Sequence, residues 1–266
     1  MVANRCATRG FTAFVLGALL ISAGVPPAAH AQSPAQDVLT TARPTIDDTQ
    51  PLTPERRADI YMARKMYREA IEIYQKIEPK TAVLWNKIGI AHHQLLNFDL
   101  AKKHYEKAVK TDPKYSEAIN NLGTVHYASK GYRKAITYYK RALAHAPNSA
   151  SIYSNLGTAF FARKKYADAF TAYQKALELD PEVFEHRGSQ GVLLQERSVQ
   201  ERAKFHFYLA KTYAKSGQTE RALLYMRKAI EEGFKERNKF NEDPEFEPLR
   251  QLPEFQQILT MENRVL

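Results

Sequence analysis

The apolar positions of the chain follow a helical period that is interrupted at regular intervals. In residues 117–128, Ile119 and Leu122 fall on one helical face. Gly131 then breaks the pattern, and a second amphipathic stretch covers residues 133–144. Apolar residues spaced by three or four positions are typical of a helix with one buried face. The pattern therefore predicts a pair of helices joined by a short turn.

This helix pair recurs every 34 residues, and small residues mark its register. Small residues are expected where paired helices approach most closely, so Gly123 and Ala135 are predicted to face each other, with Tyr139 packing against the next unit. Proline cannot continue a helix and sets the exit from each pair. The positions that recur over three units are Gly89, Gly123 and Gly157; Ala101, Ala135 and Ala169; Tyr105, Tyr139 and Tyr173; Ala108, Ala142 and Ala176; and Pro113, Pro147 and Pro181.

The first helix of each unit carries a large residue, followed three and four positions later by an aliphatic residue and glycine. Together with the alanine, tyrosine and proline positions, this pattern resembles the tetratricopeptide repeat. The resemblance implies an all-α fold, a right-handed solenoid of about five helix-turn-helix repeats with a C-terminal capping helix. The motifs that carry it are Trp85-x-x-Ile88-Gly89, Ile119-x-x-Leu122-Gly123 and Tyr153-x-x-Leu156-Gly157.

Weaker copies of the repeat flank these three units. The early copy has Ala58, Tyr61, Ala70 and Tyr74, and the late copy has Leu209, Ala210, Tyr213, Ala222, Met226 and Ala229. The predicted organisation is a signal peptide at 1–31, a flexible linker at 32–51, a repeat solenoid at 52–234 with units near 52–81, 82–115, 116–149, 150–183 and 203–234, an insertion at 184–202, and a C-terminal cap at 235–266.

The insertion has two readings. As a surface loop it is simply tolerated, because loops accept added residues at little cost. Alternatively, its apolar Val192-Leu193-Leu194 folds onto the groove of the repeats and gates it.

The N-terminus is typical of a secretory signal. Arg5 and Arg9 precede an apolar run from Phe11 to Val25. The Ala-x-Ala motif that ends at Ala31 predicts cleavage before Gln32. We therefore expect an exported, periplasmic or envelope-associated protein, with an uncleaved membrane anchor as the alternative. The single cysteine, Cys6, precedes the apolar run and would leave with it, which suits an oxidising compartment.

The net charge of +10 is concentrated in the three best repeats. Residues 87–175 hold 15 basic and 5 acidic side chains, whereas residues 241–266 hold 6 acids and 2 bases. Most of the basic residues lie on the second helices and the turns, as in Arg163-Lys164-Lys165, and are read as a solvated outer face. Because the protein is expected to be exported, we expect no nucleic-acid partner.

The resemblance places fixed positions of the first helices on a concave groove that would bind a partner. Asparagine and threonine there offer donors and acceptors for a peptide backbone, and aromatic residues offer apolar contact. Hydrogen bonding between helices is the alternative role of the asparagines. The predicted partner-binding groove consists of Asn86, Lys87, Asn120, Asn121, Thr124, Tyr127, Ser154, Asn155, Thr158 and Phe161.

Co-chaperone members of this family clamp a partner's terminal carboxylate with lysine and asparagine. Glu55 and Asp59 occupy the corresponding positions of the first unit, so binding of chaperone tails is disfavoured.

No catalytic or metal site is expected. His92 and His93 are neighbours on one helix and point about 100° apart, so they cannot converge on one ion. His92 and His126 take the aromatic core position of the repeat, and no catalytic motif is found in the sequence. We predict no enzyme activity and no cofactor.

The predicted function is a non-catalytic protein–protein interaction scaffold in an extracytoplasmic complex, which binds a peptide or partner segment in the concave groove. The alternative is a binder of anionic polymers or membrane surfaces, such as wall glycan or lipid head groups, through the basic second helices and turns. Self-association through the repeats is a third option.

Overall fold

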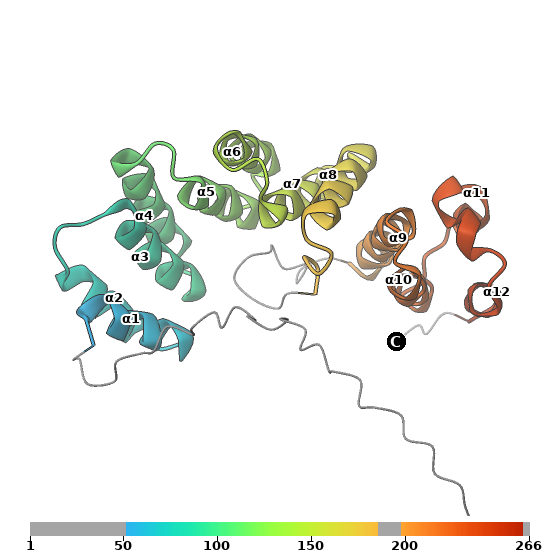
Figure 1. Ribbon diagram of the computed structural model, residues 1–266, viewed down its shortest axis with the longest axis horizontal. Coiled ribbons are helices and arrows are strands. Elements are labelled where there is room, and N and C mark those ends of the chain that lie inside the picture. Colours follow the sequence, from blue (N-terminus) through green and yellow to red (C-terminus); the bar gives the residue numbers. More distant parts are fainter. Residues whose placement is uncertain (1–51, 186–197, 263–266) are drawn as a thin grey trace, which may run out of the picture. The chain divides into compact units, whose positions relative to one another are not determined.

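A computed structural model describes residues 52–185 and 198–262, and every regular element within these ranges is helical. Ten α-helices form five consecutive pairs, so the predicted all-α repeat architecture is confirmed (Figure 1). The pairs are α1 (Pro54–Ala63) with α2 (Tyr67–Lys76), α3 (Ala82–Gln94) with α4 (Phe98–Thr111), α5 (Ser116–Ala128) with α6 (Tyr132–His145), α7 (Ala150–Ala162) with α8 (Tyr166–Leu179), and α9 (Val199–Lys215) with α10 (Thr219–Glu231).

The two helices of a pair differ because their neighbours differ. The second helix of each pair buries one narrow stripe, such as Ala135, Ile136, Tyr139 and Ala142 on α6. The first helix contacts its own partner and also helices of the adjacent repeats, as α5 does with α3, α4, α6 and α7. Its buried face is therefore wider, and its sequence is less clearly amphipathic.

Each repeat glycine makes room for a tyrosine ring. A Cβ added to Gly123 would lie 2.6 Å from Cε1 of Tyr139, which is fully buried on α6. The space beside Gly123 is thus filled by Tyr139 of the same unit, which was not predicted from the sequence, while a Cβ on the equivalent Gly157 would also lie 3.2 Å from the backbone oxygen of Ala169, the counterpart of Ala135. The ring packs on the glycine of its own unit because only a residue without a side chain leaves that space. Gly89 and Gly157 face Tyr105 and Tyr173 in the same way.

The turn inside each repeat places one residue in the left-handed backbone region. This residue is lysine in three turns, leucine in one and glycine in one, and its φ lies between 59° and 75°. The residues are Lys65, Leu96, Lys130, Lys164 and Gly217.

The C-terminal segment packs on the last pair through phenylalanine rings. It contains α11 (Lys239–Glu242), the 3-10 helix η1 (Pro244–Leu249) and α12 (Pro253–Leu259). Phe207 of α9 stacks on Phe234, with ring centroids 4.5 Å apart, and lies 5.1 Å from Phe240. These apolar contacts cover the surface that the last repeat would otherwise expose.

The predicted signal peptide, the linker and the Val192-Leu193-Leu194 gate lie outside the described residues. At the insertion, α8 ends at Leu179 and α9 begins at Val199 with Ser198 as its cap. With 17 residues, α9 is longer than the other first helices. Among the helices of residues 52–185 and 198–262, none combines the length and apolarity that crossing a bilayer requires.

Candidate functional site

The ten residues predicted to line the groove divide into two sets. Lys87, Asn120, Asn121, Thr124 and Tyr127 are partly exposed on α3 and α5, and we call these five the accessible row. The other five are buried, and four of them belong to α7: Asn86, Ser154, Asn155, Thr158 and Phe161. Partner binding by these residues stays a prediction, but only the accessible row presents surface in the described part of the chain.

Asparagine amides link three successive repeats. Asn121 Nδ2 donates to Asn86 Oδ1 at 2.9 Å, and Asn155 Nδ2 donates to Asn120 Oδ1 at 3.0 Å. Asn120 in turn donates to Asn121 Oδ1 at 3.4 Å, which joins the two bonds into one relay. The alternative role of the asparagines, hydrogen bonding between helices, is therefore present. It fixes the relative position of α3, α5 and α7.

The threonines of the first helices accept from the core tyrosines. Tyr139 donates to Thr124 Oγ1 at 3.4 Å, and Tyr173 donates to Thr158 Oγ1 at 3.3 Å. Burial raises the pKa of Tyr139 far above its ordinary value, so this hydroxyl stays protonated and remains a donor. Phe161 is covered by aromatic neighbours, with ring centroids 5.4 Å from Phe205 and 5.9 Å from Tyr208 of α9.

At one end of the accessible row, Lys87 is held by two carboxylates. Its Nζ lies 2.8 Å from Glu55 Oε1 and 2.8 Å from both oxygens of Asp59. Burial opposes the charge of Lys87, but the hydrogen bonds to Asp59 and Glu55 outweigh it and raise the lysine pKa. Tyr74 also donates to Asp59. Glu55 and Asp59, which replace the lysine and asparagine of the chaperone clamp, thus neutralise Lys87, the one lysine of the accessible row.

The histidines of the second repeat form a buried stack. The rings of His92 and His104 lie 5.2 Å apart and nearly parallel, and Trp85 lies 5.5 Å from His104. Burial, and then the charges of His92 and Lys107, lower the pKa of His104 to about 4. Stacked rings do not aim their nitrogens at a common point. Within the described ranges, no group of three or more metal-ligating side chains comes together.

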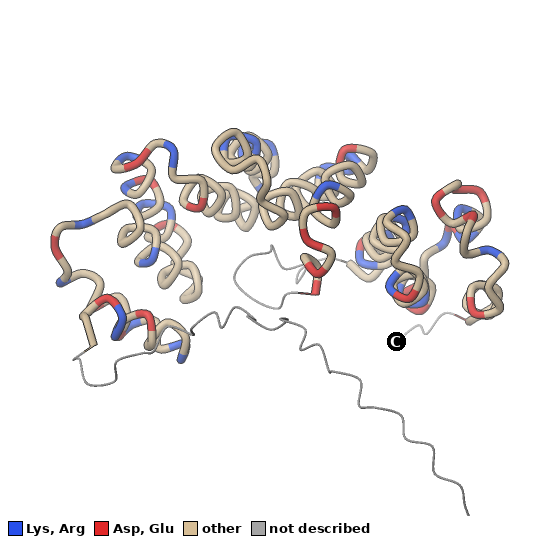
Figure 2. Tube along the Cα trace, viewed as in Figure 1, with Lys and Arg blue, Asp and Glu red and all other residues tan. Residues whose placement is uncertain are grey.

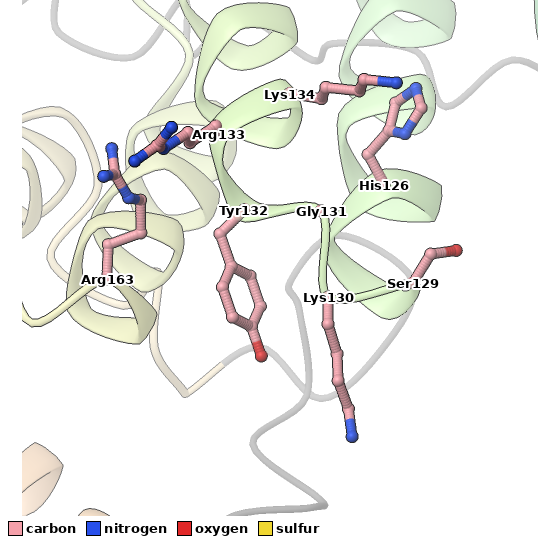
Figure 3. Close-up of a pocket in the computed structure, with 8 residues that line it drawn as sticks. All are labelled: His126, Ser129, Lys130, Gly131, Tyr132, Arg133, Lys134 and Arg163. Carbon is pink, nitrogen blue, oxygen red and sulfur yellow. The ribbon is translucent and has the colours of Figure 1, made fainter.

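A cavity lies at the turns of the third and fourth repeats, and its lining residue Tyr132 contacts Tyr127 at one end of the accessible row. Its volume is about 630 Å³. Figure 3 shows the guanidinium groups of Arg133 and Arg163 close together on one side, Lys134 beside His126 on the opposite side, and Tyr132 and Lys130 extending away from both groups in a third direction. The eight lining residues are His126, Ser129, Lys130, Gly131, Tyr132, Arg133, Lys134 and Arg163. We call it the turn cavity.

The sequence predicts a solvated outer face for these cations, and Lys130, Arg133 and Lys134 are exposed; that they line one cavity with the half-buried Arg163 was not predicted. A signal for it was present. Residues 118–167 contain eight lysine and arginine residues and no aspartate or glutamate. The charge count over residues 87–175 does not reveal this stretch, because that range also includes the acids on either side of it.

Comparison with protein families gives consistent matches over the repeats. A tetratricopeptide repeat model matches residues 81–148 and 115–182, and a second tetratricopeptide repeat model matches residues 203–232. No curated protein sequence matches the chain.

Several solved structures are similar to this chain at low sequence identity. The crystal structure of MamA is 21% identical with a TM-score of 0.46, over 66% of this chain and 93% of that one. The structure described as MamA 41-end from Desulfovibrio magneticus RS-1 is 22% identical with a TM-score of 0.47, over 67% and 92%. YrrB, described as a TPR protein with an unusual peptide-binding site, is 18% identical with a TM-score of 0.44, over 49% and 69%.

Proposed function

Because the chain belongs to the tetratricopeptide repeat family, whose members bind proteins or peptides, we propose that it is a non-catalytic scaffold that holds a partner segment on its first helices. The observation that carries the proposal is the accessible row, in which the partly exposed amide, hydroxyl and aromatic side chains of α5 lie with Lys87 of α3.

The accessible row retains hydrogen-bonding capacity after its internal bonds are counted. Each asparagine amide carries two donors and an oxygen with two lone pairs. Asn121 uses one donor toward Asn86 and one lone pair toward Asn120. The remaining donor and lone pair match the backbone groups of an extended peptide. Tyr127 adds a half-buried ring, 5.2 Å from Tyr132, against which an apolar side chain can pack.

Charge is a minor component of this surface. Lys87 is neutralised by Glu55 and Asp59, and the other four residues of the row are uncharged. We therefore expect partner binding to the row to change little with salt, because screening acts on charges.

A photocrosslinker placed at two tyrosines tests the proposal. Tyr127 and, as a matched control, Tyr138 of α6 are each replaced by p-benzoylphenylalanine, which preserves an aromatic ring. Both positions are half-buried, but they lie on the first and second helix of one repeat. In the native envelope, a defined partner crosslinks from Tyr127 and not from Tyr138. Equal crosslinking from both positions, or crosslinking from Tyr138 alone, contradicts the proposal.

The extracytoplasmic setting is part of the proposal and has its own test. N-terminal sequencing of the protein from its native cells is expected to begin at Gln32. A chain that still carries Met1 would contradict cleavage and favour a retained anchor.

A second candidate function is contact with an anionic polymer or a membrane surface. The observation that favours it is the basic turn region, where Lys164 and Lys165 are exposed beside the turn cavity. Salt separates the two candidates, because polymer binding through lysine and arginine weakens steeply between low and moderate ionic strength.

A further inference from the structure

The turn cavity concentrates positive charge in a recess shared by two repeats. Lys130, Arg133 and Lys134 come from the turn and first helical turn of the third repeat, and Arg163 caps the C-terminal end of α7 in the fourth. The volume of about 630 Å³ lies within the roughly 300–1,000 Å³ typical of ligand sites.

Among the described residues, no carboxylate forms an ion pair with Lys130, Arg133, Lys134 or Arg163, and residues 118–167 contain no acid. Glu106 of α4 acts on His126 and pairs with Lys102 at 3.8 Å. Figure 2 shows α6 with blue segments and no red ones. His126 does not add to the charge at neutral pH, because burial and the charges of Lys102 and Lys134 lower its pKa.

The first turn of α6 departs from that of every other second helix. Acids occupy this turn in the other four repeats, as Glu69, Asp99, Asp168 and Glu220. In α6 the turn holds Arg133 and Lys134 and no acid. The N-terminus of a helix favours negative charge, so cations here are unfavourable for folding. Residues that are unfavourable for folding are expected at functional sites.

From these observations we propose that the turn cavity binds an acidic segment of a protein partner through carboxylate side chains. The inference rests on the proposed function only in that the partner is a protein. Arg133 and Arg163 each present a planar fork of donors that matches a carboxylate with two hydrogen bonds. Lys134 and Lys130 lie on other sides of the cavity, where they add to its positive potential, and the Tyr132 ring packs against the segment's methylene groups.

The basic surface continues from the cavity along the next turn. Lys164 and Lys165 follow Arg163 directly and are exposed. Lys165 meets Asp168 at 3.6 Å, whereas no carboxylate pairs with Lys164 in the described ranges. Successive carboxylates of an extended segment can therefore contact the cavity and then this turn, which a single small anion cannot do. A charged concave surface also raises the association rate of an oppositely charged partner.

Binding of N-acetyl-hexaglutamate amide to the full chain, measured by fluorescence anisotropy at low salt, tests the inference. Hexaglutamine is the uncharged control peptide. The variant R133Q/R163Q is expected to bind hexaglutamate at least tenfold more weakly than the parent. The matched control R57Q/R68Q removes two exposed arginines of the first repeat and the same charge, and it is expected to stay within twofold.

Equal weakening in both double variants overturns the inference, because net charge alone would then explain the binding. Vesicles of phosphatidylglycerol and phosphatidylcholine in a 3:7 ratio form the second arm. Vesicle binding that depends on Arg133 and Arg163, without hexaglutamate binding, also overturns it and assigns the cavity to anionic membranes. If hexaglutamate fails to bind while the Tyr127 crosslink persists, this inference fails and the proposed function stands.

Discussion

Two regions of the molecule use the same cationic side chains in opposite ways. Around the last repeat and the C-terminal segment, cations meet acids: Lys211 lies 2.8 Å from Asp243 and 3.2 Å from Glu245, and Arg227 lies 2.9 Å from Glu254. Around the turn cavity, Lys130, Lys134 and the two arginines meet none in the described ranges. The difference teaches that net charge alone does not distinguish the two regions. The presence or absence of acidic neighbours among the described residues does.

We also expect the C-terminal segment to be held firmly on the last repeat by its buried aromatic residues. Phe246 is fully buried, 5.1 Å from Phe240 and 5.9 Å from Phe207. Phe246→Ala is expected to lower the free energy of unfolding by about 3–5 kcal/mol, because it leaves a cavity among these rings. Leu224→Ala, at an exposed position, is the control. Chemical denaturation of both variants measures the effect, and similar small losses would mean that the C-terminal segment is not part of the core.

Replacing one cation in each region compares them directly. Lys211→Met leaves Asp243 and Glu245 without their cation in a half-buried position, and we expect a loss of about 2 kcal/mol. Arg163→Met removes a cation that pairs with no carboxylate of the described residues, and the expected change is within about 0.5 kcal/mol. Both are read from the same denaturation curves. A larger loss from Arg163→Met would break the comparison, since it would reveal a structural role at the turn cavity.

The buried histidines show a third way to accommodate basic groups, which is to keep them neutral. The folded-state pKa of His104 is about 4, against 6.5 for an ordinary histidine. Between these values the unfolded chain binds more protons than the folded one, so stability is complete above pH 6.5 and falls as the pH drops toward 4. Lys103 and Lys107 share helix α4 with His104, and His92 faces it from α3.

His104→Phe keeps a stacked ring and removes the titrating group. We expect the loss of stability between pH 7.5 and pH 5 to be smaller than in the parent by roughly 1–2 kcal/mol, because only the 1.5 pH units between pH 6.5 and pH 5 contribute, at about 1.4 kcal/mol per unit before a discount for partial exposure. Denaturation at the two pH values gives the difference. An unchanged difference would mean that the stack does not contribute to acid sensitivity.

The fold could be predicted from the sequence because the residues that recur every 34 positions are the ones that pack the helices together. Glycine, tyrosine and proline at fixed spacing determine which helices pair, and the asparagine positions were recognised with both of their roles. The burial of Asn155, Thr158 and Phe161 could not be predicted, since it depends on what packs beside α7, such as Phe205 and Tyr208 of α9 for Phe161. A cavity formed by two turns likewise requires the distance between repeats, which spacing along the chain does not contain.

The smallest expected effect is the most direct test of why the two regions differ. Lys134→Glu restores an acid to the first turn of α6, as the other second helices have it. The helix dipole and the neighbouring cations then favour folding, and we expect a gain of about 0.5–1 kcal/mol. The same change places a negative charge at the turn cavity, so hexaglutamate binding should fall. Lys140→Glu, on the exposed face of the same helix, is the control and should bring neither change. Stability gained together with binding lost would show that the unpaired cations are retained for their ligand at the expense of the fold. A gain in stability with unchanged hexaglutamate binding would leave the cations of this turn without a binding role.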